Sequence, residues 1–444
     1  MAKKKVYFSP PRGMRDMLPY DHSFASFIKR VIRYRCRQSG IRRITTPIFE
    51  KPIILQNLPQ AHWGERALIT YPNGENNDLL LRNNFLLGVM RSYITHKMHT
   101  EPQPVELYAL DLCFHTETKV VQGVSQNYLH QFLGFDIEII GEDDPALDAQ
   151  ILKLWKTICE DAGIGVALHI RLSKIGDIES RTQFIADLQQ YYSGKERSLC
   201  DRCRENLHTK PLALLSCEEE DCKILAKLAP KIDQYLSSDV KKFYLHLEEY
   251  LEALGVDFEW QENLFPEDIS VFQPLYGEIY LDKKKIGYTG HYSRLLAEEG
   301  FDGLSGRSLF INLEDVIEFM QDQKVLVPFK DNIHVYIAQL GPEAKKKGLS
   351  LLYALREQGI KAIGSMGKGS MQEQVDMAYK FKIPYCLLLG RMEVQENTIL
   401  IRDMKTGKRE TVPFAKVIDK LLQKIPAAEL DKVKKEDIEK EFRD

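Results

Sequence analysis

Four cysteines carry the most specific chemical pattern in this sequence. Two residues separate Cys200 from Cys203, and Cys217 and Cys222 follow after spacings of thirteen and four residues. Four thiolates at such spacings suit tetrahedral zinc in a closed structural site. Because the second pair is wider than the usual spacing of about two residues, four separate surface or core thiols are the alternative. The pattern predicts a structural Zn²⁺ held by these four side chains.

The other four cysteines are Cys36, Cys113, Cys159 and Cys386, which lie in apolar runs and are predicted to be core residues. No base stands near them in the sequence, so a cysteine nucleophile is not indicated. The chain starts with a basic segment, residues 1–5, that no apolar signal region follows. No apolar run reaches the roughly 18–20 residues needed to span a bilayer. We therefore expect a cytoplasmic protein without membrane contact, whose cysteines are thiols or metal ligands.

Charge is unevenly distributed along the chain. The net charge of −3 over 444 residues argues against a protein that is basic throughout. Residues 331–425 nevertheless hold 16 Lys and Arg against 10 Asp and Glu, a net charge of +6. A basic module is compatible with a polyanionic partner such as RNA. The alternative is an ordinary solvated surface, which a charge of this size alone favours.

The apolar pattern predicts the elements that would position such groups. In residues 22–39, Phe24, Ile28 and Ile32 share one helical face. Residues 135–140 alternate as a half-buried strand should. The other expected elements of this block are strands at 41–49, 105–115, 129–140 and 165–172, a hairpin at 66–82, and helices at 85–98 and 145–162. This mixture of strands, hairpins and helices indicates an antiparallel α+β core.

The rest of the chain divides into further segments. Residues 175–255 are mainly helical and charged and read as an insertion, after which strands and one helix return and a linker follows at 321–328. Beyond the linker, strands at 334–339, 361–365 and 384–389 alternate with helices at 342–358 and 370–380, and a hairpin follows at 398–412. This alternation predicts a small α/β domain with a parallel sheet. The expected domains are 1–174 and 256–325 for the two parts of the core, 175–255 for the insertion, 331–425 for the α/β domain, and 426–444 for a charged tail.

Several short motifs resemble those of one family. They are Pro11–Asp16, Thr46–Glu50, Leu81–Leu86, Phe114–Glu117, His130–Phe132 and Gly367–Gln374. They are similar to motifs of the histidyl-tRNA synthetases, which are class II aminoacyl-tRNA synthetases, and the resemblance covers about residues 8–425. It implies a class II synthetase-like antiparallel sheet core with a helical insertion and a C-terminal α/β anticodon-binding-like domain. It also implies a homodimer that forms through the region of residues 46–50.

The resemblance implies roles for individual residues, and some of them depart from the family. Arg82 and Glu117 match family residues, whereas Asn84 stands where a glutamate helps to hold the substrate amino group. His115 replaces the arginine that contacts the α-phosphate of ATP. An arginine fork meets phosphate with two hydrogen bonds and a permanent charge, whereas a histidine offers one donor and is mostly neutral at pH 7. His115 is either a weak substitute or a tolerated surface or cleft histidine.

Other arginines of the family are also missing. His291 and Asp315 stand where arginines occur in later motifs, and Asp315 would repel a triphosphate unless Mg²⁺ intervened. The segment 262–278, where the family has its histidine-specific signature, contains no arginine. Losing one preorganised donor to a developing charge costs about 10²–10³ in rate. With this resemblance, these losses indicate a degenerate paralogue that does not form histidyl-adenylate by the usual route.

The C-terminal domain keeps its likeness better. Its turn at 367–374 resembles the Gly-Gly-Ser turn of the synthetase anticodon-binding domain, and Ser370 is expected to cap the next helix. The candidate RNA-binding residues are Lys368, Ser370, Gln374, Lys405, Lys408 and Arg409. The alternative is that the glycines only close turns and the basic residues form a solubilising face.

Two functions follow from the resemblance. The first is a pseudoenzyme, a tRNA-binding or regulatory paralogue deficient in aminoacylation, for which tRNA, and also a protein, are the expected partners. A precedent is the regulatory subunit of ATP phosphoribosyltransferase, although that subunit typically lacks a C-terminal domain such as this one. The second is a divergent but active histidine–tRNA ligase, which would need ATP and Mg²⁺.

Overall fold

The structure is a computed structural model that describes residues 9–51, 69–71, 79–121, 124–266, 271–298, 300–301, 303–327, 333–364, 369–427 and 430. The chain forms two compact units, Met1–Pro328 and Phe329–Asp444. Each unit has its own buried apolar core, and each is described by itself. No helix within the described ranges is long and apolar enough to cross a membrane.

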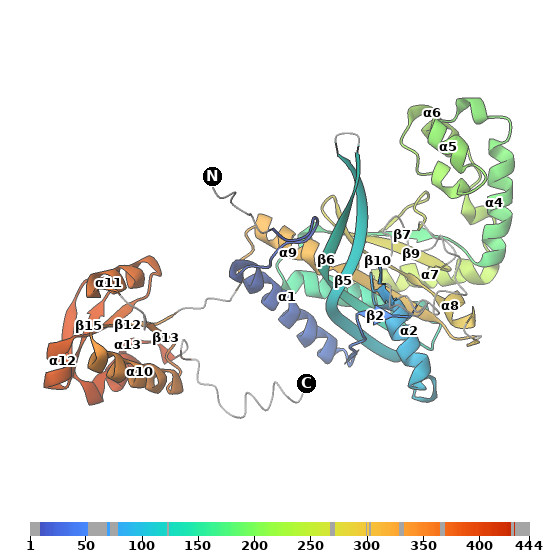
Figure 1. The fold of residues 1–444 in the computed structure, drawn as a ribbon. Coiled ribbons are helices and arrows are strands. Elements are labelled where there is room, and N and C mark those ends of the chain that lie inside the picture. Colours follow the sequence, from blue (N-terminus) through green and yellow to red (C-terminus); the bar gives the residue numbers. More distant parts are fainter. Residues whose placement is uncertain are drawn as a thin grey trace. The chain divides into compact units, whose positions relative to one another are not determined.

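An eight-stranded sheet forms the centre of the first unit (Figure 1). Its strands, from edge to edge, are β1 (Arg42–Arg43), β5 (Val105–Val121), β6 (Val124–Ile140), β11 (Gly306–Asn312), β10 (Lys284–His291), β9 (Leu275–Leu281), β7 (Leu168–Lys174) and β8 (Glu259–Trp260). All neighbouring strands are antiparallel except the two edge pairs, β1 with β5 and β7 with β8. The predicted antiparallel α+β core is confirmed.

A second, three-stranded sheet has the order β2 (Phe49–Glu50), β4 (Leu79–Leu81) and β3 (Ile69–Tyr71). The antiparallel pair β3–β4 is the hairpin expected at 66–82, whose turn lies outside the described residues. The strands expected at 105–115 and 129–140 are longer than predicted and pair without interruption from Val105↔Ile140 to Val121↔Val124. Figure 1 shows this pair extending as a long hairpin past the rest of the sheet.

Helices cover both faces of the eight-stranded sheet. On one face, α1 (Pro19–Gln38), α3 (Pro145–Asp161) and α9 (Leu313–Asp322) share a core with residues of β6 such as Phe135 and Ile137. We call this the α3 face.

On the other face, α2 (Leu86–Thr95) and α8 (Ser293–Glu298) share a core with Phe132 and Ile140 of β6. We call this the α2 face. Successive side chains of a strand point to opposite faces, so Asp136 and Glu138 point to the α2 face, together with Phe132 and Ile140. Strand β6 therefore places two acids in the core under the α2 face, whereas Phe135 and Ile137 of the same strand enter the core under the α3 face.

The segment expected to be an insertion is helical, as predicted. Its elements are α4 (Ile178–Tyr192), α5 (Asp201–Asn206), α6 (Glu220–Lys227) and α7 (Ser238–Ala253), with short 3₁₀ turns at Glu196–Ser198, Pro211–Leu214 and Ile232–Gln234. Other 3₁₀ turns of this unit are at Met98–Thr100 and Gly165–Ala167. The side chains of Asp177 and Ser237 cap α4 and α7 by accepting hydrogen bonds from backbone N–H groups. Figure 1 shows α5 and α6 gathered near one end of α4, away from the sheet.

The second unit contains a five-stranded sheet in the order β13 (Ala362–Gly364), β12 (Val335–Gln339), β14 (Tyr385–Leu389), β15 (Thr398–Asp403) and β16 (Arg409–Pro413). The first three strands are parallel, and β15 and β16 form the expected antiparallel hairpin. Its helices are α10 (Pro342–Glu357), α11 (Met371–Lys380), α12 (Arg391–Glu396) and α13 (Val417–Lys424), with a 3₁₀ turn at Phe414–Lys416. The predicted parallel α/β domain is confirmed, and α12 is an element that the apolar pattern did not indicate.

Candidate functional site

His115 lies in a ring stack on the long hairpin. The pairing of β5 with β6 places it opposite His130, and the two imidazole rings stack with centroids 4.7 Å apart and an angle of 18° between their planes. The ring of Phe132 packs edge-on against His115 at 5.2 Å. His130 Nε2 in turn lies 3.2 Å from a carboxylate oxygen of Glu117. The structure thus brings His115 and Glu117 together around His130, with His115 buried in a packed stack.

Arg82 is committed to contacts inside the protein. Its guanidinium donates to the backbone carbonyls of Leu112 at 2.7 Å and Thr46 at 2.8 Å, and its Nη2 lies 3.1 Å from a carboxylate oxygen of Asp111. The same group packs over the ring of Phe85, 4.7 Å from its centroid. These contacts join the segment before α2 to strand β5. They leave little of the charged fork to offer to a ligand, because its side chain is only 4% exposed.

Asn84 lies at the α2 face beside a half-buried tyrosine. Its side-chain amide donates a hydrogen bond of 3.0 Å to the hydroxyl of Tyr288. Tyr288 is paired across the sheet with Phe310, which is itself paired with Asp136. Burial raises the pKa of the Tyr288 hydroxyl, and the negative charge of Asp136 raises that pKa further. Asn84 therefore sits in the same polar row as an acid from β6.

Two acids on this face were not recognised as site residues from the sequence. Asp136 and Glu138 are 0% and 1% exposed. Within the part of the chain that the structure describes, none of their four carboxylate oxygens accepts a hydrogen bond of ordinary geometry. Burial raises the pKa of Glu138 to about 8, and burial together with the neighbouring Glu138 raises the pKa of Asp136 well above its usual range. Two adjacent acids without a cation are costly to bury.

The signal for these two acids was present but ambiguous. In residues 135–140 the acids alternate with apolar residues, which is the pattern of a strand with one solvated face. The pattern gave the correct alternation, but α2 and α8 cover the face that the acids occupy. The sequence of the strand alone does not show whether its acids are buried or solvated. The apolar residues of α2 and α8, which cover this face, decide that they are buried.

A third acid of the α2 face has partners. Glu278 of β9 accepts hydrogen bonds from the hydroxyls of Tyr276 at 3.2 Å and Tyr280 at 2.5 Å, and it is paired with Lys285. The guanidinium of Arg171 packs over the ring of Tyr280, 4.4 Å from its centroid. Lys285 is therefore paired with Glu278, and Arg171 is packed on Tyr280.

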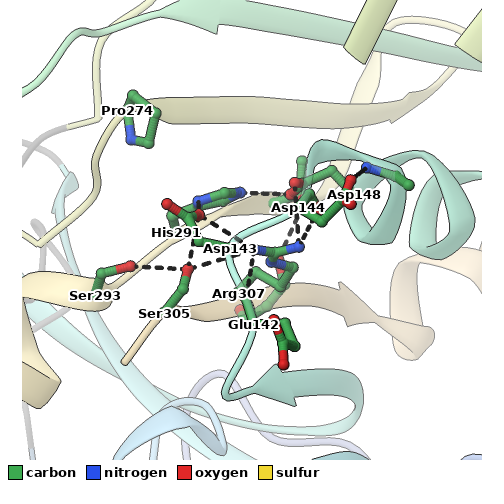
Figure 2. Close-up of polar contacts among 12 residues, drawn as sticks. Glu142, Asp143, Asp144, Asp148, Pro274, His291, Ser293, Ser305 and Arg307 are labelled. Carbon is green, nitrogen blue, oxygen red and sulfur yellow. Dashed lines mark hydrogen bonds and ion pairs between the residues drawn. The ribbon is translucent and has the colours of Figure 1, made fainter. Parts of the chain in front are cut away.

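His291 lies on the opposite, α3 face, as Figure 2 shows. Its Nε2 lies 2.6 Å from Asp148 Oδ1 of α3, and both residues are almost fully buried. Arg307, paired with His291 across the sheet, donates to the carbonyls of Asp144 at 2.5 Å and Glu142 at 2.8 Å, and lies 3.6 Å from Asp148. His291 is therefore part of an ion-pair network and is not brought together with His115 or Asn84.

Asp315 forms part of the first turn of α9 and pairs with Lys284 at 2.8 Å. An acid in the first turn of a helix is favoured by the helix dipole, so this position has a structural role here. Lys284 also pairs with Glu318 at 2.9 Å.

The four cysteines of the insertion form a cluster. The sulfur atoms of Cys200, Cys203, Cys217 and Cys222 all lie within 4.8 Å of one another, which is a group that could hold a metal ion. Three of the four are buried and Cys200 is half-buried.

The other four cysteines, Cys36, Cys113, Cys159 and Cys386, are fully buried, so the prediction of core thiols is confirmed. Burial raises the pKa of Cys36 to about 12 and that of Cys386 to about 12. Both thiols therefore stay protonated at neutral pH.

The turn before α11 has well-defined geometry. Ser370 caps the helix by accepting a hydrogen bond from the backbone N–H of Glu373 at 3.2 Å, while Glu373 accepts from the N–H of Ser370 at 2.7 Å. The amide of Gln374 is buried and bridges the backbone N–H and carbonyl of Gln339 in β12. Ser370 and Gln374, two of the RNA-binding candidates, therefore have structural contacts within the domain. A third candidate, Lys368, lies outside the described residues.

The remaining RNA-binding candidates, Lys405, Lys408 and Arg409, lie on the hairpin of β15 and β16 and are exposed. The carboxylate of Asp403 accepts hydrogen bonds from the backbone N–H groups of Lys405 and Thr406, which fixes the turn that carries them. A fixed turn with three exposed cations is suited to contact phosphates.

Comparisons with known proteins agree with this architecture. A family model described as an anticodon binding domain matches residues 334–424. A histidine–tRNA ligase of Anoxybacillus flavithermus is 27% identical over 414 residues, covering 91% of this chain and 96% of the relative. The crystal structure of apo histidyl-tRNA synthetase from S. aureus has a TM-score of 0.74 at 23% identity and covers 94% of this chain and 100% of that one.

A structure from Bacillus halodurans titled as an ATP phosphoribosyltransferase regulatory subunit/histidyl-tRNA synthetase shares the fold at 16% identity. Its TM-score is 0.60, and it covers 87% of this chain and 99% of that one. The matched anticodon-binding domain, the ligase relatives that align over nine-tenths of the chain and the common fold show that the chain is similar to histidyl-tRNA synthetases over most of its length.

Proposed function

We propose that this protein is a catalytically deficient member of its family that acts by binding tRNA. In this proposal it does not form histidyl-adenylate by the arginine-dependent route, and it works as a cytoplasmic homodimer whose second unit contacts RNA. The proposal has two parts, an inactive first unit and an RNA-binding second unit, which separate experiments test.

The observation that carries the first part is that the described residues of the α2 face near His115 offer no available positive charge. Two buried acids, Asp136 and Glu138, lie on this face without a hydrogen-bonded cation among the described residues. Arg82, the family arginine that is retained, is bound to backbone carbonyls and to Asp111. A triphosphate needs charge-assisted donors in preorganised positions. Asp136 and Glu138 supply no such positive donor: while protonated they are neutral, and once ionised they repel phosphate.

The same acids are complementary to a different ligand group. A buried carboxylate pair is stabilised by an ammonium or another small cation, because an opposite charge within a few ångströms favours the ionised form. We therefore propose that this face binds the amino group of a small amine or amino acid without activating it. The hydroxyls of the half-buried Tyr288 and the fully buried Tyr292, both close enough to the acids for their charge to act on them, would supply hydrogen bonds to such a ligand.

The second part is supported by the matched anticodon-binding domain and by the exposed cations of the β15–β16 turn. Three phosphate contacts from Lys405, Lys408 and Arg409 would make tRNA binding strongly dependent on salt.

One specific observation favours an alternative function. A carboxylate pair able to hold an amino group is also what an active ligase needs for its amino acid, and ligase relatives align over most of the chain. In that case the protein would be a divergent histidine–tRNA ligase that uses ATP and Mg²⁺, with the α-phosphate held by groups other than His115 and Arg82.

A pyrophosphate exchange assay separates the two functions. Histidine-dependent exchange between ATP and pyrophosphate, measured with the purified full-length chain at high concentration, is expected to stay at the level of the no-histidine control. Clear exchange that requires histidine and Mg²⁺ would establish the ligase and contradict the first part of the proposal.

Gel-shift titration with total tRNA at several salt concentrations tests the second part. The triple variant Lys405→Ala, Lys408→Ala, Arg409→Ala should weaken binding and reduce the salt dependence by about two to three units of slope. The matched control removes three other exposed lysines of the same unit, Lys345, Lys346 and Lys416. Equal weakening by both variants would mean that charge alone, and not the turn, binds RNA. Unchanged binding by the first variant, or no tRNA binding by the parent chain, would contradict the second part; in that case the regulatory role, through a protein partner, becomes the better function.

A further inference from the structure

The cysteine cluster of the insertion is a candidate metal site that lies apart from the α2 face. Its ligand atoms come from three separate places in the chain. Cys200 precedes α5, Cys203 lies within α5, Cys217 follows the 3₁₀ turn at Pro211–Leu214, and Cys222 lies in α6. The fold brings all four sulfur atoms within 4.8 Å of one another.

We infer that these four thiolates bind one Zn²⁺ as a closed structural site. The spacing of the sulfur atoms supports a tetrahedral metal site. A Zn–S distance of about 2.3 Å places neighbouring sulfur atoms of a tetrahedron about 3.8 Å apart. The sulfur atoms of Cys200 and Cys217 are 3.8 Å apart. A disulfide would need sulfur atoms about 2.05 Å apart.

The donor set and its surroundings fit zinc and a structural role. Four thiolates fill a tetrahedron and leave no open position for a water or substrate, which is the arrangement of structural and not of catalytic zinc. The backbone N–H of Cys200 is directed at the sulfur of Cys222, 3.3 Å away. Such hydrogen bonds to a ligand sulfur orient it and stabilise its negative charge.

The local architecture explains what the metal would do. The elements that carry the cysteines are short: α5 has six residues, the 3₁₀ turn at Pro211–Leu214 has four and α6 has eight. Helices of this length are not stable by themselves. Apolar side chains of this region, such as Leu199, Leu207 and Leu214, are buried in the same apolar core as Tyr192 and Leu188 of α4. A metal that joins the three segments would hold this small core together, so the zinc is expected to be a condition for the fold of about residues 199–229.

Two contacts connect this small core to the longer helix α4. The hydroxyl of Tyr191 donates a hydrogen bond of 2.9 Å to the carbonyl of Leu225 in α6, and the amide of Gln189 donates one of 3.4 Å to the carbonyl of Leu207. Loss of the metal should therefore release α5 and α6 from α4, while the eight-stranded sheet, which contributes no ligand, keeps its structure.

Elemental analysis and native mass spectrometry of the full chain, purified without added zinc, are expected to give about one zinc ion per chain. Cys217→Ser and Cys222→Ser should each reduce this content at least tenfold. The matched control is Cys386→Ser, which changes a buried cysteine of the second unit and should leave the zinc content unchanged. An absence of bound metal in the parent chain, iron in place of zinc, or a content unaffected by Cys217→Ser would overturn the inference.

A second measurement does not depend on whether the variants fold. The parent chain is treated with a strong zinc chelator and then digested briefly with trypsin, and the fragments are identified by mass. Cleavage after Arg202, Arg204 or Lys223 is expected to become at least tenfold faster after chelation and to return to its original rate when zinc alone is added back. Cleavage at these residues that is equally fast before chelation would show that no metal holds the segment.

Discussion

The two faces of the eight-stranded sheet bury acids in opposite ways. On the α3 face, Asp148 lies against His291 and near Arg307, whose guanidinium also bonds to backbone carbonyls. On the α2 face, Asp136 and Glu138 lie side by side without a hydrogen-bonded cation among the described residues. The first acid is paired and the other two are not. A protein retains a paired buried charge for its structure, whereas an unpaired one is costly and points to a ligand.

Two residues singled out by the family resemblance lie in different parts of the first unit. His291 and His115 both stand where the family has arginines, yet His291 belongs to the paired network of the α3 face and His115 to a ring stack of the long hairpin. The two histidines therefore lie in different environments. The α2 face buries two acids without a paired cation among the described residues, whereas the α3 face holds a balanced set of charges.

The largest effect is expected from breaking the paired face. Arg307→Met removes the buried guanidinium and leaves Asp148 with His291 alone, so the free energy of unfolding should fall by about 3–5 kcal/mol. Urea denaturation followed by tryptophan fluorescence measures it, because Trp63, Trp155 and Trp260 all belong to the first unit. A loss below about 1 kcal/mol would mean that the network contributes little and that the two faces do not differ as described.

A smaller effect of opposite sign is expected on the unpaired face. The pKa of Glu138 rises from an ordinary value of 4.5 to about 8 on folding. Between these values the folded state binds more protons than the unfolded one, so stability falls as pH increases from about 4.5 to 8. Glu138→Gln should remove this dependence and raise the free energy of unfolding at pH 8 by about 1 kcal/mol or more. At pH 5 the variant should match the parent.

The matched control for this prediction is Asp148→Asn, the same change from acid to amide on the paired face. It should lower stability at both pH values, because it weakens a network that is already satisfied. If both amide variants shift stability in the same direction, the distinction between the faces is wrong.

A third and more modest effect concerns the ligand. L-histidine at about ten times its dissociation constant should stabilise the parent chain by about 1.4 kcal/mol, and the effect should be larger at pH 8 than at pH 6, where Glu138 is protonated. Thermal-shift titration measures it. The analogue imidazolelactate, which lacks the amino group, should give a much smaller shift, and Glu138→Gln should abolish the response to both. Equal shifts from the two ligands would exclude the acid pair as an amine site.

The smallest effect is expected from restoring a single guanidinium. His115→Arg should leave pyrophosphate exchange at the background level, because Arg82 stays bound to its backbone partners and no arginine occurs in 262–278. The effects of residues that act together in catalysis are not additive, so restoring one of several missing arginines is not expected to restore activity. Exchange above background in this variant would show that one missing contact was the whole defect.

The architecture was largely predictable because it depends on apolar periodicity. The helix expected at 22–39 occurs at Pro19–Gln38, displaced at its start because the carboxylate of Asp21 accepts the backbone N–H of Leu18 and stabilises an earlier first turn. The strands of the long hairpin were predicted too short because their outer ends, such as Thr116–Thr118, are polar. Cross-strand hydrogen bonds continue there although the apolar alternation stops.

The site was less predictable because face and register are properties of the folded sheet. An irregularity between Lys285 and Gly287 shifts the register of β10 against β9, and an odd shift transfers side chains from one face to the other. No pattern in the sequence marks this irregularity, so the burial of His291 under α3 could not be foreseen. The four cysteines were predictable as a group, since their spacing is a local property, and the structure brings them together.

The buried amide of Gln374 also has a consequence for the second unit. It donates to the carbonyl and accepts from the N–H of Gln339, so a side chain on a helix acts as an extra peptide unit beside β12. These hydrogen bonds fix the start of α11 to the sheet, and a further one from Gln374 to the carbonyl of Gly369 fixes the Gly369–Ser370 corner, in the chain by itself. A nucleic acid that meets this corner would not have to order it first, and the entropy already lost on folding would favour a fast and selective encounter.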